Sequence, residues 1–196
     1  MSELKTRLDD VFDLFRDRLA TAEALSVSDP FSTDNPPGIG SPLRVLSIHI
    51  QGVPFALIGL SSPSISPLSS PLINYLGRRA QAHKLPYLLV CNQREAILLP
   101  TPARDGMIKE PLRKYPVIFS ISPNATDPLA PIERNDLLNV ADHMASDLRD
   151  LHRDGSLDLV LPDVDFFVDR LTRTVQALVR LHISVVIDTT DLSTAE

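Results

Sequence analysis

The chain has 196 residues, 43% of them hydrophobic and 22% charged, which is enough to bury the core of a single globular domain. Its single cysteine, Cys91, excludes an internal disulfide and a multi-cysteine zinc site, and no apolar run reaches the length that spans a membrane. The formal charge of −6 argues against uniform binding to nucleic acid, and the amino terminus lacks a signal-peptide pattern, so we expect a cytoplasmic protein without a membrane segment.

The first part of the chain alternates between periodic and irregular segments. Apolar residues spaced three and four apart predict an amphipathic helix over residues 3–25, with Ser2 as its N-cap. Residues 26–42 contain Pro-Pro-Gly and are expected to form a loop. Two apolar runs, 44–50 and 53–60, flank Gln51-Gly52 and predict a hairpin.

The remainder of the chain predicts further helices and short strands. In order, we expect a surface loop over 61–71, a helix over 72–84, strands over 87–91 and 96–99, a basic loop over 100–116, a strand over 117–121, and helices over 136–151 (N-cap Asn135) and 164–182 (N-cap Asp163). This order predicts an α/β (α+β) fold with a central mixed sheet of about five strands flanked by helices. We expect a domain over 1–185 and a tail or linker over 186–196, which would lead to a further domain if the native protein is longer.

Charge is unevenly distributed along the chain. Residues 72–116 carry eight cations against three acids, a net charge of +5, whereas 124–169 carry three cations against eleven acids, a net charge of −8. Such a basic segment can bind the phosphates of DNA, although a solvated loop beside an acidic helix explains the same pattern. The candidate nucleic-acid-binding residues are Arg78, Arg79, Lys84, Arg94, Arg104, Lys109, Arg113 and Lys114.

Short motifs accompany this order of elements. Pro42-Leu43 opens the predicted hairpin, 58–63 closes it, 86–92 follows the basic helix, and Phe-Val-Asp-Arg-Leu stands at 167–171. The arrangement resembles the N-terminal domain of many N6-adenine DNA methylases and restriction subunits, which has the PD-(D/E)XK nuclease-like fold. In such domains Pro-Asp starts the hairpin, Glu-x-Lys ends it, and a helix then leads to a strand ending Thr-Asn-Gly.

The chain departs from this pattern at the positions that carry the chemistry. Leu43 stands where the Asp belongs, Gly59 replaces the acid, Ser61 replaces the Lys, and Asn92 is kept but is followed by Gln93. The nucleases hold a divalent cation between carboxylates, and the cation activates water. The resemblance therefore implies a centre that cannot bind Mg²⁺, and we expect neither catalysis nor a cofactor.

Other sources of catalytic groups are weaker. The first helix offers Glu3, Asp9, Asp10 and Asp13, and the basic loop offers Asp105, Lys109 and Glu110, but solvated surface charges are the simpler interpretation of both sets. A nucleophilic pairing of Cys91 with His49 or His83 would need spatial proximity that the sequence does not give. We expect Cys91 to be a small buried residue.

Three hypotheses for function follow. The first is a catalytically inactive nuclease-like module that contacts or positions DNA within a restriction-modification or phage-defence protein, with a fused methylase domain or a protein partner. The alternative is a protein-interaction or oligomerisation module without nucleic-acid binding. The third is an active metal-dependent nuclease with relocated acids.

Overall fold

The computed structural model describes residues 6–34, 36, 38–102, 110–117, 121–157 and 175. The chain divides into two compact units, Met1–Ser156 and Leu157–Glu196, and every element described below belongs to the first. Apart from Val175, the helix predicted over 164–182 and the tail over 186–196 lie outside the described residues. The domain predicted over 1–185 therefore stays a prediction.

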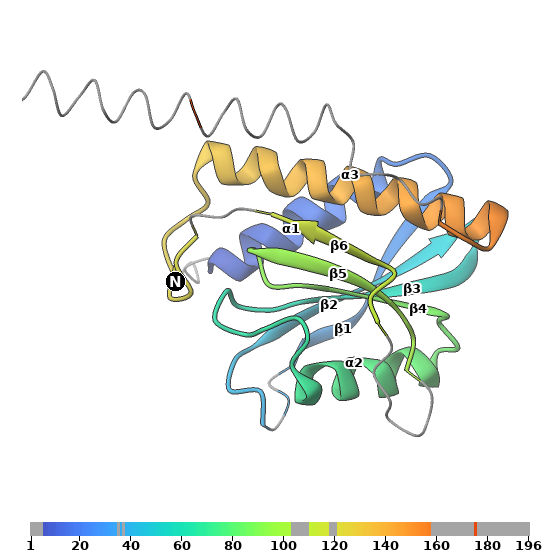
Figure 1. Cartoon of the computed structure of the whole chain (residues 1–196), viewed down its shortest axis with the longest axis horizontal. Coiled ribbons are helices and arrows are strands. Elements are labelled where there is room, and N and C mark those ends of the chain that lie inside the picture. The colour runs from blue at the N-terminus through green and yellow to red at the C-terminus, as the bar shows by residue number, and fades with distance from the viewer. Residues whose placement is uncertain are drawn as a thin grey trace, which may run out of the picture. The chain divides into compact units, whose positions relative to one another are not determined.

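The first unit is built on a mixed sheet whose strand order follows the sequence, β1-β2-β3-β4-β5-β6 (Figure 1). Only the neighbours β3 and β4 are parallel, and all other neighbours are antiparallel. The described sheet has six strands where about five were expected, and the predicted α+β class is confirmed. The strands are β1 (Leu25–Asp34), β2 (Leu43–Ile50), β3 (Val53–Leu60), β4 (Tyr87–Cys91), β5 (Glu95–Pro100) and β6 (Arg113–Pro116).

Helices cover both faces of this sheet. Figure 1 shows α1 (Arg7–Ala20) and α3 (Pro131–Asp154) on one face and α2 (Ser70–Ala82) on the opposite face. Helix α2 connects the parallel strands β3 and β4, because a parallel pair needs a crossover of this length. Among the described helices, none is both long enough and apolar enough to cross a membrane.

Two predictions of irregular structure are wrong. The loop expected over 26–42 contains most of β1, which pairs with β2 through Val27 opposite Ile48 and Ser28 opposite Ser47. Its serines, aspartates and proline hide the strand signal, and they suit an edge strand whose pairing is interrupted twice. The basic loop expected over 100–116 ends in β6. Most of the strand expected over 117–121 lies outside the described residues.

The helix ends also differ from the predictions. Thr6 is the N-cap of α1 rather than Ser2, because its side chain accepts a hydrogen bond from the Asp9 N–H while the Asp9 carboxylate accepts from the Thr6 N–H. Helix α3 begins at Pro131 rather than after Asn135. Proline is favoured in the first turn of a helix. In addition, the Glu133 carboxylate accepts a hydrogen bond from the Ala130 N–H at 2.8 Å.

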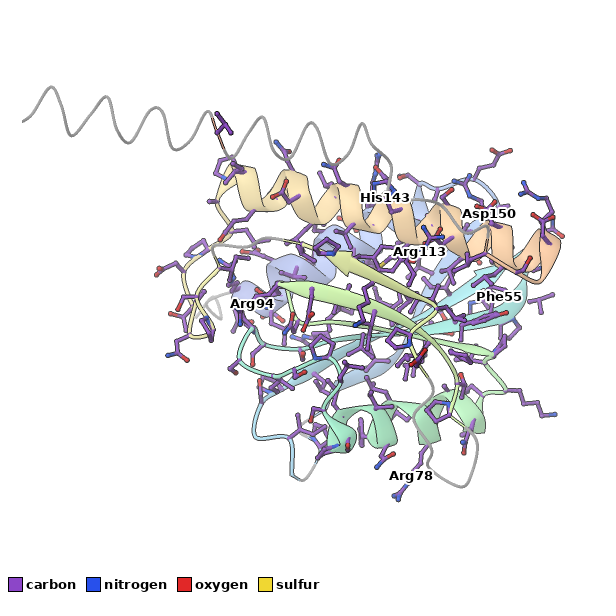
Figure 2. All side chains as sticks on the ribbon, viewed as in Figure 1. Phe55, Arg78, Arg94, Arg113, His143 and Asp150 are labelled. Carbon is purple, nitrogen blue, oxygen red and sulfur yellow. The ribbon has the colours of Figure 1, made fainter. Side chains whose placement is uncertain are left out.

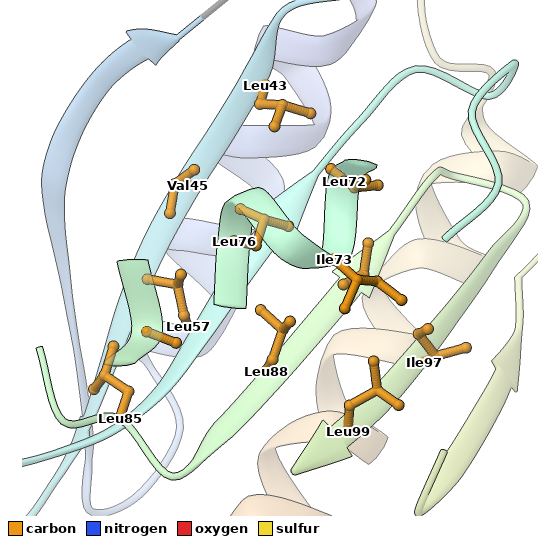
Figure 3. Packing of buried hydrophobic residues seen from close by; sticks show 12 residues of the cluster. Leu43, Val45, Leu57, Leu72, Ile73, Leu76, Leu85, Leu88, Ile97 and Leu99 are labelled. Carbon is orange, nitrogen blue, oxygen red and sulfur yellow. The ribbon is translucent and has the colours of Figure 1, made fainter. Parts of the chain in front are cut away.

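An apolar core fills the space between α2 and the sheet (Figure 3). Each fully buried aliphatic side chain contributes about 1.5 to 3 kcal/mol relative to exposure, so this cluster fixes α2 firmly on the sheet. Its buried members are Leu43, Val45, Leu57, Leu72, Ile73, Leu76, Ala80, Leu85, Leu88, Val90, Ile97 and Leu99. Leu43, a position the resemblance assigns to catalysis, is one of them.

Candidate functional site

The hairpin positions of the nuclease-like motif meet at one end of the sheet. Leu43 is the first residue of β2, Val45 pairs with Gly59, and Ser61 directly follows β3. Cross-strand partners share a face, and residues two apart along a strand share a face. Because Leu43 and Val45 belong to the core beneath α2, Gly59 and Ser61 face α2 as well.

This centre is closed by packing. Leu43 is 0% exposed, and the side chain of Leu76 lies directly over Gly59. A Cβ atom at position 59 would lie far inside contact distance of Leu76 Cδ1 and 3.0 Å from its Cδ2. The space that an acidic side chain would need at position 59 is therefore occupied by a leucine.

Ser61 supplies no charge where the motif has a lysine. Its N–H donates to the Cys91 carbonyl at 2.9 Å, which ties the end of β3 to the end of β4. Its Oγ is buried without a hydrogen-bond partner among the described residues. No group of three His, Cys, Asp or Glu residues in the described part of the chain could hold a metal ion.

Asn92 has a structural role in this arrangement. Its Nδ2 donates to the Ile65 carbonyl at 2.8 Å, and its Oδ1 accepts from the N–H groups of Arg94 at 3.0 Å and Glu95 at 2.9 Å. Asn92 thus forms the turn from β4 to β5 and fixes the Ser- and Pro-rich loop that precedes α2. These bonds account for an asparagine at this position without a catalytic role.

The next residue, Gln93, adopts a conformation that glycine favours, with φ at 71°. Its side chain is 1% exposed and bridges two elements. Its Oε1 accepts from Arg7 Nε at 2.8 Å, and its Nε2 donates to the Ser61 carbonyl at 3.3 Å. These bonds offset the cost of a side chain at positive φ, where the resembling domains carry glycine.

Arg7 is a buried residue at this end of the sheet that sequence reasoning missed. Its guanidinium donates to the Asp127 carbonyl at 2.9 Å and pairs with Glu133 at 3.1 Å. The position follows the i, i+4 spacing of the buried side of α1, because Val11 and Phe15 continue the same stripe. The presence of an arginine on this apolar stripe was therefore the sequence feature from which the burial of Arg7 could have been predicted.

The acids of the first helix are engaged in local structure. Asp9 caps α1 with Thr6 and forms an ion pair with Arg44. Burial raises the pKa of Asp9, but hydrogen bonds from Thr6 and Arg44 outweigh this effect and hold that pKa below its ordinary value. Asp13 pairs with Arg16 at 2.9 Å. Glu3, Asp105 and Lys109 lie outside the described residues, and Glu110 is exposed.

Cys91 is fully buried, which confirms that it is a small core residue. Burial raises the pKa of its thiol to about 12. A thiol with this pKa is protonated near neutral pH, and the thiolate is the nucleophilic form of cysteine. The site therefore gives no support for a cysteine nucleophile.

The candidate cations lie in separate places. Arg78 and Arg79 are on α2 and Lys84 follows it, Arg94 is in the turn from β4 to β5, and Arg113 and Lys114 are on β6. Figure 2 shows Arg78, Arg94 and Arg113 well apart. Arg113 is directed to α3, where it pairs with Asp147 at 3.3 Å. Arg104 and Lys109 lie outside the described residues.

Helix α2 is distinguished by its electrostatic surroundings. The sequence contains no Asp or Glu from residue 35 to residue 94, whereas α1 carries four acids and α3 carries six. Ion pairs engage the arginines Arg7, Arg16, Arg18, Arg44, Arg113 and Arg153. Within the part of the chain that the structure describes, Arg78, Lys84 and Arg94 form no ion pair. Among the described residues, the positive charges of Arg78 and Lys84 are therefore not paired with an acid.

The chain matches no family model, no curated protein and no solved structure. The resemblance to nuclease-like domains rests on the motif positions and on the order of the elements around them.

Proposed function

We propose that the chain is a nuclease-like module that has lost its catalytic centre and holds DNA through the cations of α2. In this proposal it positions DNA within a cytoplasmic restriction-modification or phage-defence protein. The observation that carries the proposal is the combination of a centre filled by Leu76 with exposed cations, Arg78 and Lys84, in a stretch of sequence that contains no acid.

The order and pairing of the elements support the nuclease-like part of the proposal. A hairpin, a helix and a strand follow each other as the resemblance requires, and the last strand is parallel to the second hairpin strand. The positive φ of Gln93 occurs where the resembling domains have glycine. A positive φ is the conformation that glycine favours, so the backbone at this position is compatible with the glycine of the resembling domains.

The loss of catalysis follows from the packing of the hairpin end. A metal-dependent nuclease needs carboxylates that face a hydrated cation. Here Leu43 and Leu76 are fully buried, and a Cβ atom at position 59 would meet the Leu76 side chain. A cation placed there would lose its water without gaining a charged ligand, which is strongly unfavourable.

The binding part of the proposal rests on charge. Arg78 and Lys84 are exposed, and Arg79 stacks on the Tyr75 ring at 4.9 Å, which holds its guanidinium at the helix surface. Cations without nearby acids attract a polyanion and release its counterions on binding. Contacts of this kind hold the phosphate backbone and carry no sequence information directly.

The dependence of binding on salt tests this proposal. If the three α2 cations each contact one phosphate, log K for a short labelled DNA duplex should fall with log salt with a slope of about −2.7. The double variant Arg78→Glu, Lys84→Glu should lower the affinity at low salt by at least about tenfold and flatten the slope. Fluorescence anisotropy over a series of NaCl concentrations measures both quantities.

Arg134→Glu is the control for the single variant Arg78→Glu, because Arg134 is an exposed arginine of α3 on the opposite face and both changes alter the net charge equally. It should bind DNA almost as the unmodified chain does. Undetectable binding by the unmodified chain at low salt, or an equal loss in the control, would contradict the proposal.

A second candidate is a protein-interaction or oligomerisation module without nucleic-acid binding. The separation of Arg94 and Arg113 from the α2 cations favours it, because the basic residues do not form one continuous surface. Light scattering coupled to size exclusion separates the two candidates. A stable oligomer that persists in high salt and binds no duplex would support the second.

A further inference from the structure

One arginine of α2 is held in place by an aromatic ring. The guanidinium carbon of Arg79 lies 4.9 Å from the centroid of the Tyr75 ring, a distance at which the ring face attracts a cation. The two residues are four positions apart, so they are neighbours on one side of the helix. Both side chains are half-buried, whereas the adjacent Arg78 is exposed and points away from the sheet (Figure 2).

The Tyr75 ring is itself held by the rest of the domain. Tyr75 packs against the apolar core between α2 and the sheet, to which Leu72 and Leu76 of the same helix belong. Close-packed neighbours leave little space for other rotamers, so a ring that rests on such a core moves little. Tyr75 is therefore a rigid support for the Arg79 guanidinium.

The stack leaves the hydrogen-bonding groups of Arg79 in place. The ring contact engages the flat face of the guanidinium, whereas its N–H donors lie in the plane and point outward from its edge. Two of these donors match two oxygens of a phosphate or a carboxylate. An arginine that already rests on a ring loses less side-chain freedom when it binds such a group, so the contact is tighter.

We infer, on the basis of the proposed function, that Tyr75 is a positioning residue, which holds Arg79 ready to bind two oxygens of one phosphate in the DNA backbone. Arg78, Arg79 and Lys84 lie in the same acid-free stretch of sequence, so charge alone does not distinguish them. The supported, planar fork of Arg79 does, because a lysine is a flexible point charge and Arg78 is exposed.

Substitutions that conserve the net charge test this role. Arg79→Lys keeps the cation but loses the planar fork, so it should weaken binding of a labelled duplex at low salt by about two- to fivefold. Tyr75→Leu removes the support and should weaken binding by a similar factor. Tyr75→Phe keeps the ring and should bind almost as the unmodified chain does. Fluorescence anisotropy measures the affinities, and thermal unfolding shows whether each variant remains folded.

A double-mutant cycle separates positioning from a general structural role. In a chain that carries Tyr75→Leu, the further change Arg79→Lys should cost little affinity, because the stack is already absent. Arg78→Lys is the matched control, since it changes an exposed arginine of the same helix. Its effect on affinity should be the same with and without Tyr75→Leu.

The outcomes separate this role from the proposed function. Equal affinities of Tyr75→Leu and Tyr75→Phe, or additive losses for Tyr75→Leu and Arg79→Lys, would overturn the positioning role. A lower unfolding temperature of Arg79→Lys at unchanged affinity would overturn it as well. If binding is still lost in the variant Arg78→Glu, Lys84→Glu, α2 remains the binding element. No binding by the unmodified chain would overturn both.

Discussion

Gly59 is a residue whose lack of a side chain decides what the site can be. The neighbouring Leu76 fills the volume that a side chain would take, and both residues face the same core. Packed interiors tolerate added atoms poorly, because neighbours must leave their preferred rotamers. The position therefore couples the identity of residue 59 to that of residue 76.

Gly59→Ala should destabilise the chain by about 1 to 3 kcal/mol, and Leu76→Ala by about 2 to 5 kcal/mol. The double variant should lose less than the sum, because the shortened residue 76 makes room for the new methyl group. Urea unfolding measures each free energy. Leu72→Ala, another fully buried leucine of α2, is the control, and its effect should add to that of Gly59→Ala within about 0.5 kcal/mol.

Cys91 makes stability depend on alkaline pH. Burial raises the folded pKa of its thiol from 9.0 to about 12. Below pH 9 the thiol is protonated in both states, so its full contribution is present. As the pH rises from 9 towards 12, the thiol of the unfolded chain ionises while that of the folded chain stays protonated. The free energy of unfolding should therefore fall by up to about 1.4 kcal/mol per pH unit.

Cys91→Ala should remove this slope. Both proteins keep Tyr115, whose pKa burial and the Asp147 carboxylate also raise, so the difference between their unfolding curves isolates the thiol. Denaturant unfolding from pH 8 to pH 10.5 measures it. Parallel curves for the two proteins would show that the thiol does not carry the effect.

Among the elements, β6 depends on contacts outside the sheet. It has four residues and lies at an edge, and the Tyr115 hydroxyl donates to Asp147 of α3 at 2.5 Å. Arg113 reaches the same carboxylate. A buried carboxylate with two donors fixes the strand on the helix, because any shift would leave the charge without its partners.

Tyr115→Phe should therefore cost about 1 to 3 kcal/mol, because it leaves part of the buried Asp147 carboxylate unsatisfied. Hydrogen exchange of the β6 amides should accelerate more than exchange in β3. Lys114→Ala is the control, since Lys114 is exposed on the same strand. Equal acceleration in β3 and β6 would show global unfolding rather than release of the edge strand.

The elements also show what sequence reasoning can reach. The continuous apolar runs of β2 to β5 and the periodic stripes of the helices predicted most of the sheet, because burial imposes those patterns. Strands β1 and β6 were not predicted, because edge strands tolerate serine, proline and charged residues and distant residues determine how these strands pair. The missing acids at 43 and 59 were visible in the sequence. The filling of the space over Gly59 by Leu76, and the burial of Arg7, depend on how α2 and α1 meet the sheet, and no local pattern encodes that.

In the first unit as a whole, the helices on the two faces of the sheet differ in charge. Acids gather on α1 and α3, where arginines neutralise many of them, and α2 lies in a tract without acids. The field of this unit would therefore orient it before contact with a polyanion, with α2 facing the polyanion. Lowering the salt concentration should strengthen this orientation, because screening weakens.

The described residues contain no group that could hold a metal ion, and this has a consequence for the stability of the chain. Millimolar Mg²⁺ or Mn²⁺ should leave the unfolding temperature unchanged relative to EDTA, because a ligand stabilises a protein only if it binds the folded state. Differential scanning fluorimetry measures the shift. A rise with either cation that Asp9→Ala removes would support relocated acids and an active nuclease.

The unbroken correspondence between strand order and chain order also bears on how the domain assembles. Each strand after the first pairs with the strand that precedes it in the sequence, and the segment from β3 to β4 is the longest connection between neighbouring strands of the described sheet. Short loops close at little entropic cost, so we expect the β2–β3 hairpin to protect its amides early in refolding. Helix α3 packs against α1, although all six described strands lie between the two helices in the sequence. Pulse-labelled hydrogen exchange should therefore find α1 protected late, although it precedes the sheet in the sequence.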